Sequence, residues 1–466
     1  MTTIIDSISK ELDYSQVMSS HSSPAYVKLN SISNITSFTP SISSVSQLTE
    51  FLLPARVLSL KKSRLNFSVN FPGQGASLFT YVQGNALTMI DRIVLTSTST
   101  NTTLCDISNF SRYASMISPV ATTFSEVQNK ASSVGTSSVT AIAPMQVSAT
   151  LADQYKLEDV SRCNQLINPD GLNVEPACPY FYIKKNFVST AVNTANFLSF
   201  NIPLDAIQYS IFDVDKLLYF GGENIMMSIY WSPANKYTWV GTSATNPSTA
   251  AAVITVAPII SNLSLYCYVE QNNDIITNLV SKVNTEGVSI NFPYPQISRY
   301  NLSGSSQSFT INLGRSYGKS LLFTLVSPFN TTESNNTAQD HGSAINLRTN
   351  FTACNYNTFL NATPITSSSN IDVFQSEPWI YNKFNLYNSA IQSLPAYDVD
   401  FVHIDNFMGK SLAEADRSAS DGYVLDTNSQ YQFQLNGVGT GNVINWYIAI
   451  VGLKTLNLSA NGVSVS

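Results

Sequence analysis

The chain has 466 residues and a mass of 50.9 kDa, more than one ordinary hydrophobic core accommodates, so two or three domains are expected. Only 12% of the residues are charged, yet 44% are hydrophobic and 11% aromatic, which excludes a disordered chain. A net charge of -6 argues against general affinity for nucleic acid or anionic membranes. Ser, Thr and Asn replace the missing charge, which suits a protein whose surface is largely covered by copies of itself.

The five cysteines predict neither a zinc site nor a disulfide framework, because they are far apart and form no Cys-x-x-Cys pair. They are Cys105, Cys163, Cys178, Cys267 and Cys354. We expect reduced, mostly buried thiols, with a single Cys163–Cys178 bridge as the alternative. The N-terminal sequence carries Asp6, Glu11 and Asp13 where a signal peptide needs an apolar core, so it does not predict secretion.

Residues 1–45 are expected to form an N-terminal arm. Ile4, Ile5, Ile8 and Leu12 fall on one side of a possible short helix, and a Ser-rich stretch without a clear period follows. Two interpretations remain open for this stretch: a flexible terminus, and an arm that docks on a neighbouring subunit.

The same order of strand patterns occurs twice along the chain. Residues 64–69 alternate between apolar and polar, a Gly-rich turn follows, and residues 91–97 are mostly apolar. Much later, residues 309–313 alternate, a Gly/Ser turn follows, and residues 321–326 are mostly apolar. Each time a half-buried strand precedes a strand buried on both faces, which is how a β-sandwich begins.

We therefore predict an all-β chain of two consecutive eight-stranded jelly-roll sandwiches with short helices in loops. The first covers residues 46–272, an amphipathic connector covers 273–286, and the second covers 287–466. Helices are expected from Pro203 to Leu218 and from Ser376 to Ile391, where apolar residues recur at helical spacing. No short fixed period repeats, which favours jelly rolls over propeller blades.

Two glycine-containing stretches imitate phosphate-binding loops. Residues 314–320 have three residues where a P-loop has four between its glycines, and a strand rather than a helix follows. Residues 437–441 contain spaced glycines but no helix follows to hold a pyrophosphate. Both stretches are interpreted as turns.

Residues 398–405 are the best candidate for metal or acid–base chemistry. On a strand, Asp398 and Asp400 share one face, whereas His403 and Asp405 share the other. The two pairs therefore cannot converge without a bulge, and a structural His403–Asp405 pair is favoured over catalysis. No catalytic, cofactor-binding or metal-binding residue is predicted, and no cofactor is expected.

The order of features resembles the double jelly-roll major capsid proteins of icosahedral double-stranded DNA viruses, of the virophage and Polinton-like virus type. The stretches that carry the likeness are Phe51–Pro54 leading into Leu65–Val69, Ile90–Tyr113, Ile202–Trp231, Phe309–Val326 and Asp400–Leu453. The resemblance implies a homotrimeric capsomer of pseudo-hexameric outline that tiles a virion shell. It also implies penton and minor capsid proteins as partners, contact of the N-terminal arm with an internal membrane, and synthesis in the host cytoplasm.

Two other functions remain open. A viral attachment protein that binds carbohydrate needs an exposed aromatic cluster, for which Tyr237 to Trp239 is the best candidate. An enzyme would have to use Asp398 or Asp400 without a recognisable catalytic set. Basic pairs at Lys61–Arg64 and Lys184–Lys185 are too sparse for a nucleic-acid groove and are interpreted as solvated strand ends.

Overall fold

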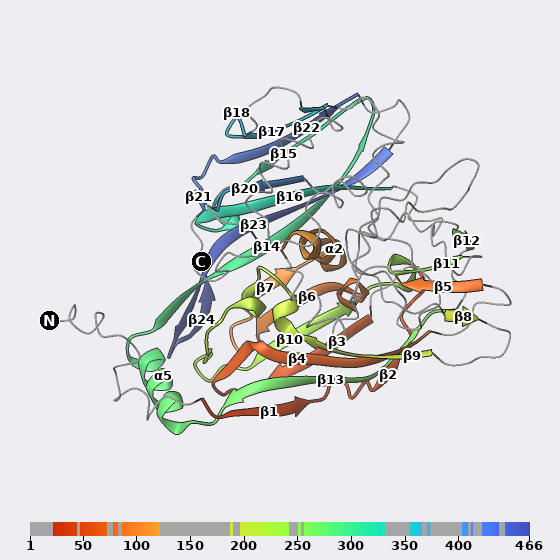
Figure 1. Cartoon of the computed structure of the whole chain (residues 1–466). Coiled ribbons are helices and arrows are strands. Elements are labelled where there is room, and N and C mark those ends of the chain that lie inside the picture. The colour runs from red at the N-terminus through yellow and green to blue at the C-terminus, as the bar shows by residue number, and fades with distance from the viewer. Residues whose placement is uncertain are drawn as a thin grey trace, which may run out of the picture.

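Two β units make up the part of the chain that the structure, a computed structural model, describes. The described residues are 22–43, 47–71, 78–82, 86–121, 187–189, 196–241, 250–252, 256–330, 355–365, 371–372, 403–408, 412, 422–437 and 443–466. In Figure 1 the first unit lies at the bottom and the second at the top, with helix α2 (Phe110–Ala121) between them. No helix among these residues is long and apolar enough to cross a membrane.

The first unit is a sandwich of two antiparallel sheets. One sheet has the order β1 (Pro24–Leu29), β13 (Ile259–Glu270), β4 (Leu58–Phe71) and β9 (Asn196–Pro203), with β2 (Ser37–Phe38) also paired to β13. The other has the order β3 (Gln47–Leu53), β10 (Ile225–Trp231), β6 (Ile90–Ser97) and β7 (Thr103–Ile107). A smaller sheet joins β12 (Ala250–Ala252), β11 (Thr238–Gly241), β5 (Leu78–Val82) and β8 (Phe187–Ser189).

The second unit is built in the same way. Its first sheet has the order β14 (Val288–Ser303), β23 (Val443–Ser459), β16 (Ser320–Asn330) and β20 (His403–Asn406), with β21 (Tyr423–Val424) on β16 and β24 (Gly462–Val465) on β23. The second sheet has the order β15 (Ser306–Asn312), β22 (Gln430–Asn436), β17 (Asn355–Leu360) and β18 (Thr363–Pro364), with β19 (Ile371–Asp372) on β17.

The two units share one strand connectivity. When the strands on these four-strand paths are numbered in chain order within each unit, one sheet runs first, eighth, third, sixth. The other sheet runs second, seventh, fourth, fifth, and both statements hold for both units. The prediction of two consecutive jelly rolls is therefore confirmed.

The sequence comparison was nevertheless offset by one strand. It matched residues 64–69, in β4, with residues 309–313 at β15, whereas β4 is the third strand of its unit and corresponds to β16. The two corresponding strands differ in pattern because their surroundings differ. The outer face of β4 is solvent-facing, so β4 alternates, whereas Phe323 of β16 packs on Tyr209 of the first unit and its neighbours are all buried.

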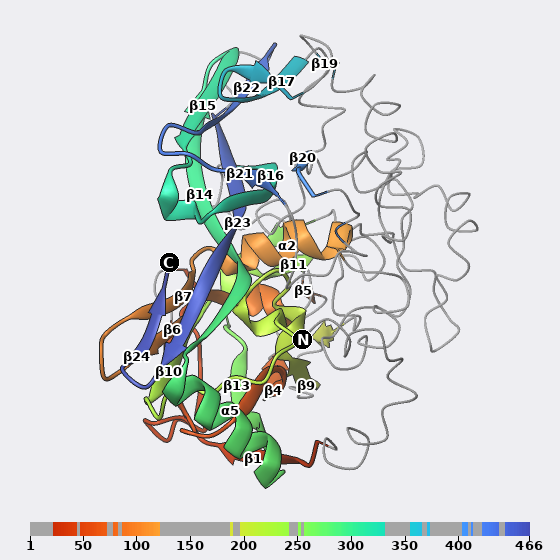
Figure 2. The same cartoon turned by 90° about the vertical axis from the view of Figure 1, so that its left-hand side faces the viewer.

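The strand that corresponds to β14 is β1, and it lies within the range 1–45 that was expected to form an arm. Residues 273–286, the expected connector, contain helix α5 (Asn273–Thr285), whose N-cap Asn272 accepts a hydrogen bond from the Asp274 backbone. Figure 2 shows β14 and β23 extending from the second unit along one side of the first, toward α5. The domain limits themselves stay predictions.

The expected helix from Pro203 to Leu218 is wrong. The structure has two short 3-10 helices there, Leu204–Ala206 and Ile211–Asp213, separated by Tyr209 with a φ of 51°. A left-handed residue of this kind ends an α-helix. The apolar residues at helical spacing are still buried, so their spacing here indicates that they belong to the core and does not indicate a helix. The second expected helix, Ser376–Ile391, lies outside the described residues.

Helix α2 was not predicted from the sequence. Phe110, Tyr113 and Ile117 are buried, but so are the polar Ser111 and Arg112. A helix that is covered on most sides lacks the one-sided apolar stripe that marks a surface helix. It is covered because it lies between the two units and packs on β16. The other 3-10 helices among the described residues are Ala86–Met89, Ala234–Lys236 and Arg315–Tyr317.

Each unit holds a buried tryptophan whose indole N–H is bonded. In the first, Trp231 packs edge-on against Phe67 of the facing sheet, with ring centroids 5.0 Å apart, and donates to Thr49 Oγ1 at 2.9 Å. In the second, Trp446 contacts Phe433 at 5.0 Å and donates to Gln307 Oε1 at 2.8 Å. The indoles therefore contribute apolar burial without an unpaired donor.

Candidate functional site

His403 and Asp405 form a buried pair inside the second unit. His403 Nε2 lies 3.1 Å from Asp405 Oδ2, and the side chains are 1% and 0% exposed. The phenol of Tyr431, on the facing sheet, donates to the same carboxylate oxygen at 2.9 Å. Burial, followed by the charge of Asp405, raises the pKa of Tyr431, so the phenol keeps its proton and remains a donor.

The prediction that His403 and Asp405 share a face is confirmed by their contact. Asp398 and Asp400 lie outside the described residues. The edge-on ring of Tyr356, 4.9 Å from His403, covers the imidazole further. The buried carboxylate thus links the two sheets of the second unit. Within the described ranges, no group of three or more His, Cys, Asp or Glu side chains could hold a metal ion.

The stretch that imitates a P-loop is a turn pressed against β23. Arg315–Tyr317 forms a 3-10 helix, and Lys319 N donates to Leu453 O at 2.8 Å. Gly318 has a φ of 113°, and a Cβ there would overlap the Leu453 carbonyl. The Lys319 N–H, which a phosphate would need as a donor, is thus bonded to the backbone of β23. Of the second glycine stretch only Gly437 is described, and its N–H donates to Ser305 O at 2.9 Å.

Tyr237, the first ring of the candidate carbohydrate cluster, is fully buried, and burial raises its pKa. It cannot contribute an exposed stacking surface. Thr238 and Trp239 belong to β11, which pairs with β5, and their side chains are not among those that the structure describes.

Cys105 and Cys267 are buried free thiols, as expected, and burial raises the pKa of Cys267 to about 11. The other three cysteines are not among the described residues.

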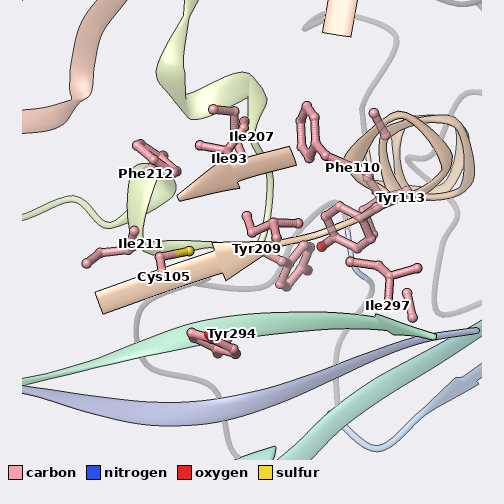
Figure 3. Close-up of a cluster of buried hydrophobic side chains, with 14 of the residues drawn as sticks. Ile93, Cys105, Phe110, Tyr113, Ile207, Tyr209, Ile211, Phe212, Tyr294 and Ile297 are labelled. Carbon is pink, nitrogen blue, oxygen red and sulfur yellow. The ribbon is translucent and has the colours of Figure 1, made fainter. Parts of the chain in front are cut away.

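The functional feature that sequence inspection missed is the junction between the two units. Figure 3 shows Tyr294 and Ile297 on β14 facing a cluster from the first unit that includes Cys105, Tyr113 and Tyr209. The Tyr294 hydroxyl accepts a hydrogen bond from Asp106 N at 3.2 Å. From β23, Lys454 Nζ lies 3.8 Å from the centroid of the Tyr294 ring.

Tyr209 makes the second set of contacts across the junction. Its ring packs edge-on against Phe323, with centroids 4.8 Å apart, and its hydroxyl donates to Leu412 O. Arg112 of α2 lies over the ring of Tyr447 at 5.7 Å. Apolar packing and bonded polar groups thus alternate along the junction, as they do in a protein interior.

The C-terminal hairpin forms the far end of the junction. Val463 N of β24 donates to Glu223 Oε1 at 3.2 Å, and Ser97 of the first unit donates to the other carboxylate oxygen. Gly221 has a φ of 65°, and a Cβ there would lie 2.5 Å from Ser459 O. The two units are therefore held at both ends of their contact. In the sequence, the only local signal for this close approach is the pair Gly221–Gly222.

No protein-family model and no curated protein matches the sequence. Solved structures do match. The Faustovirus major capsid protein has a TM-score of 0.56 at 9% identity, with 94% of this chain and 91% of that chain covered. A chain of the Sputnik virophage structure has a TM-score of 0.51 at 14% identity, covering 95% and 88%. PBCV-1 VP54, fitted into a Sputnik reconstruction, has 0.51 at 9%, covering 96% and 97%.

The class of fold follows from the connectivity and these likenesses together. The chain has the double jelly-roll fold of viral capsid proteins. At these identities the likeness extends to the fold alone.

Proposed function

We propose that the chain is the major capsid protein of an icosahedral double-stranded DNA virus, and that it forms homotrimeric capsomers of pseudo-hexameric outline. The observation that carries the proposal is the repeated connectivity of two jelly rolls joined by a buried junction. Three copies of such a chain place six similar sandwiches around one axis, so a trimer can fill a six-neighbour position in a shell. Because the junction fixes the two jelly rolls of a chain to each other, each chain enters the capsomer as one rigid unit.

The composition supports the same role. With 12% charged residues and a net charge of -6, the chain has a surface rich in Ser, Thr and Asn. A surface with so few charges is suited to burial in contacts between copies of the chain. Penton and minor capsid proteins are the further partners that we propose, with an internal membrane as a contact of the N-terminal arm. The proposal places the chain in the virion after synthesis in the host cytoplasm without secretion. It is structural and includes no catalytic step and no sequence-specific nucleic-acid contact.

Native mass spectrometry and negative-stain electron microscopy of the purified full chain test the proposal. We expect a species of three times the chain mass of 50.9 kDa and particles of triangular or hexagonal outline. A monodisperse monomer at micromolar concentration, with no trimer on raising the concentration, would overturn it. Glycan-array binding with no assembly would instead favour an attachment protein.

A further inference from the structure

The outer face of the first sheet carries cations and tyrosines on neighbouring strands. We call this surface the cationic pad, and its residues are Tyr26, Lys28, Lys62, Arg64, Tyr266 and Tyr268. In the sheet register Lys28 of β1 lies beside Tyr266 of β13, which lies beside Arg64 of β4. The side chains of Lys28, Lys62 and Arg64 are exposed, and in the described part of the chain no ion pair joins them to a carboxylate.

The rings of the pad pack with its cations. Lys62 Nζ lies 5.0 Å from the centroid of Tyr268, and Tyr26 meets Tyr268 edge-on at 5.7 Å. Tyr26 is 51% exposed. The sequence interpretation of Lys61–Arg64 as a strand end is wrong, because these residues lie inside β4. Lys28 of β1 lies on the other side of β13 from them. An exposed cationic surface on an acidic chain points to an acidic occupant.

The chain enters the first sheet on the same face as the pad. Glu270 follows Tyr268 by two residues on β13 and so shares its face. Glu270 Oε1 accepts from Ser23 N at 2.7 Å, and Oε2 accepts from Ser22 Oγ at 2.5 Å. Ser22 Oγ also lies 2.8 Å from the hydroxyl of Tyr268. Residues 1–21 are thus tethered at the edge of the pad, which gives them a high effective concentration there.

The sequence of that segment has the complementary charge. Residues 1–21 contain Asp6, Glu11 and Asp13 against one cation, Lys10. In a helix, Asp6 and Asp13 lie together with Lys10 on the side opposite Ile4, Ile5, Ile8 and Leu12, so that side carries two carboxylates against one cation. The Cα atoms of Asp6 and Asp13 are about 10 Å apart along the axis. Lys28 and Arg64 are two strand spacings apart, also about 10 Å.

We propose that the chain's own N-terminal segment, residues 1–21, docks on the cationic pad as a helix that crosses the strands, with Asp6 and Asp13 over Lys28 and Arg64. Asp13 and Ser22 are nine positions apart, which is a reach of up to about 30 Å when extended, so the connection spans the pad. The apolar side of the helix then faces away from the sheet and is available for a second contact. The docking does not depend on capsid assembly.

Zero-length carbodiimide cross-linking of the full chain, with mass spectrometry of the peptides, tests this placement. We expect amide cross-links from Asp6 and Asp13 to Lys28 and Lys62, and few to the exposed Lys216 outside the pad. Arg64→Gln removes a pad cation that does not itself cross-link, so the yield at Lys28 and Lys62 should fall several-fold. Lys216→Gln is the matched control and should leave that yield unchanged.

An equal mixture of isotopically labelled and unlabelled chains identifies which copy supplies the segment. Cross-links that join peptides of one isotopic kind support docking within the chain. Cross-links that join labelled to unlabelled peptides would overturn the proposal in favour of a neighbouring copy. Cross-links from Asp6 and Asp13 that are no more frequent at Lys28 and Lys62 than at Lys216 would overturn the pad as the docking surface.

Discussion

Gly462 on the C-terminal hairpin lies against the carboxylate of Glu223 in the first unit so closely that a Cβ at residue 462 would overlap Oε1. The neighbouring Val463 N–H donates to that same oxygen at 3.2 Å. The last strand of the second jelly roll is therefore fixed to a loop of the first at a glycine with a φ of 118°, where a larger residue would be strained and would displace the Glu223 carboxylate. This contact and the packing around Tyr209 and Tyr294 join the two sandwiches to each other.

Gly462→Ala should weaken the junction. The residue has a φ of 118°, so alanine meets both backbone strain and the Glu223 carboxylate, and we expect a loss of about 2–4 kcal/mol in the free energy of unfolding. Gly304→Ala is the matched control, because Gly304 has a φ of 97° with no atom within 4 Å of the added Cβ. Denaturant unfolding of both variants separates close approach from strain. Equal losses would show that the Glu223 contact contributes nothing.

The junction also explains why sequence inspection recovered the fold but not the correspondence of its strands. The alternation of polar and apolar residues over 64–69 predicts a strand with one solvent-facing side, and β4 is such a strand. Its counterpart β16 lacks that period because the first unit covers its second face, with Tyr209 on Phe323. The residue pattern of one strand does not show whether the other unit covers the strand's second face.

The same limit applies to the site. His403 and Asp405 share a strand, so their spacing alone placed them on one face. Glu223 and Val463 are far apart in the sequence, and only the folded topology brings them together. Tyr209, with a φ of 51°, turned an apparent helical period into two 3-10 turns, which no local propensity for tyrosine indicates.

Tyr294 and Lys454, on neighbouring strands of the second unit at the junction, should be energetically coupled. The ammonium lies 3.8 Å from the ring centroid, and burial lowers the pKa of Lys454, which indicates a partly desolvated cation. A double-mutant cycle with Tyr294→Leu and Lys454→Met should give a coupling of about 0.5–2 kcal/mol. The pair Lys62 and Tyr268, at 5.0 Å with Lys62 exposed, is the comparison and should give less. No coupling at Tyr294 would mean that the ring only fills space.

Asp405→Leu should destabilise the second unit strongly. It removes the acceptor that Tyr431 and His403 share inside the sandwich, where the side chains of His403 and Asp405 are 1% and 0% exposed. Removing one partner of a buried pair costs about 3–5 kcal/mol. The exposed Asp215→Leu should change the free energy of unfolding by about 0.5 kcal/mol or less. Denaturant unfolding monitors both variants, and an Asp405→Leu chain as stable as the parent would exclude a structural role for the pair.

The hydrogen bonds around Glu270 predict a stability difference that depends on pH. Burial acts to raise the pKa of Glu270, but hydrogen bonds from Ser22 and from the backbone N–H groups of Asn272, Ser23 and Gln271 outweigh it and lower the pKa below its ordinary 4.5. A carboxyl with a lowered folded-state pKa stabilises the fold fully above that ordinary value. The contribution is lost as the pH falls through the folded-state pKa.

Glu270→Gln should therefore be less stable than the parent at pH 7, by about 1–3 kcal/mol because charge-assisted hydrogen bonds are lost. The difference should shrink once the pH falls below 4.5, where the parent carboxyl takes up its proton. Denaturant unfolding of both chains across the acid range measures it. Glu286→Gln, at an exposed position after α5, serves as the control and should track the parent at every pH. A difference for Glu270→Gln that stays constant down to acid pH would mean that the ionised carboxylate does not hold the start of β1.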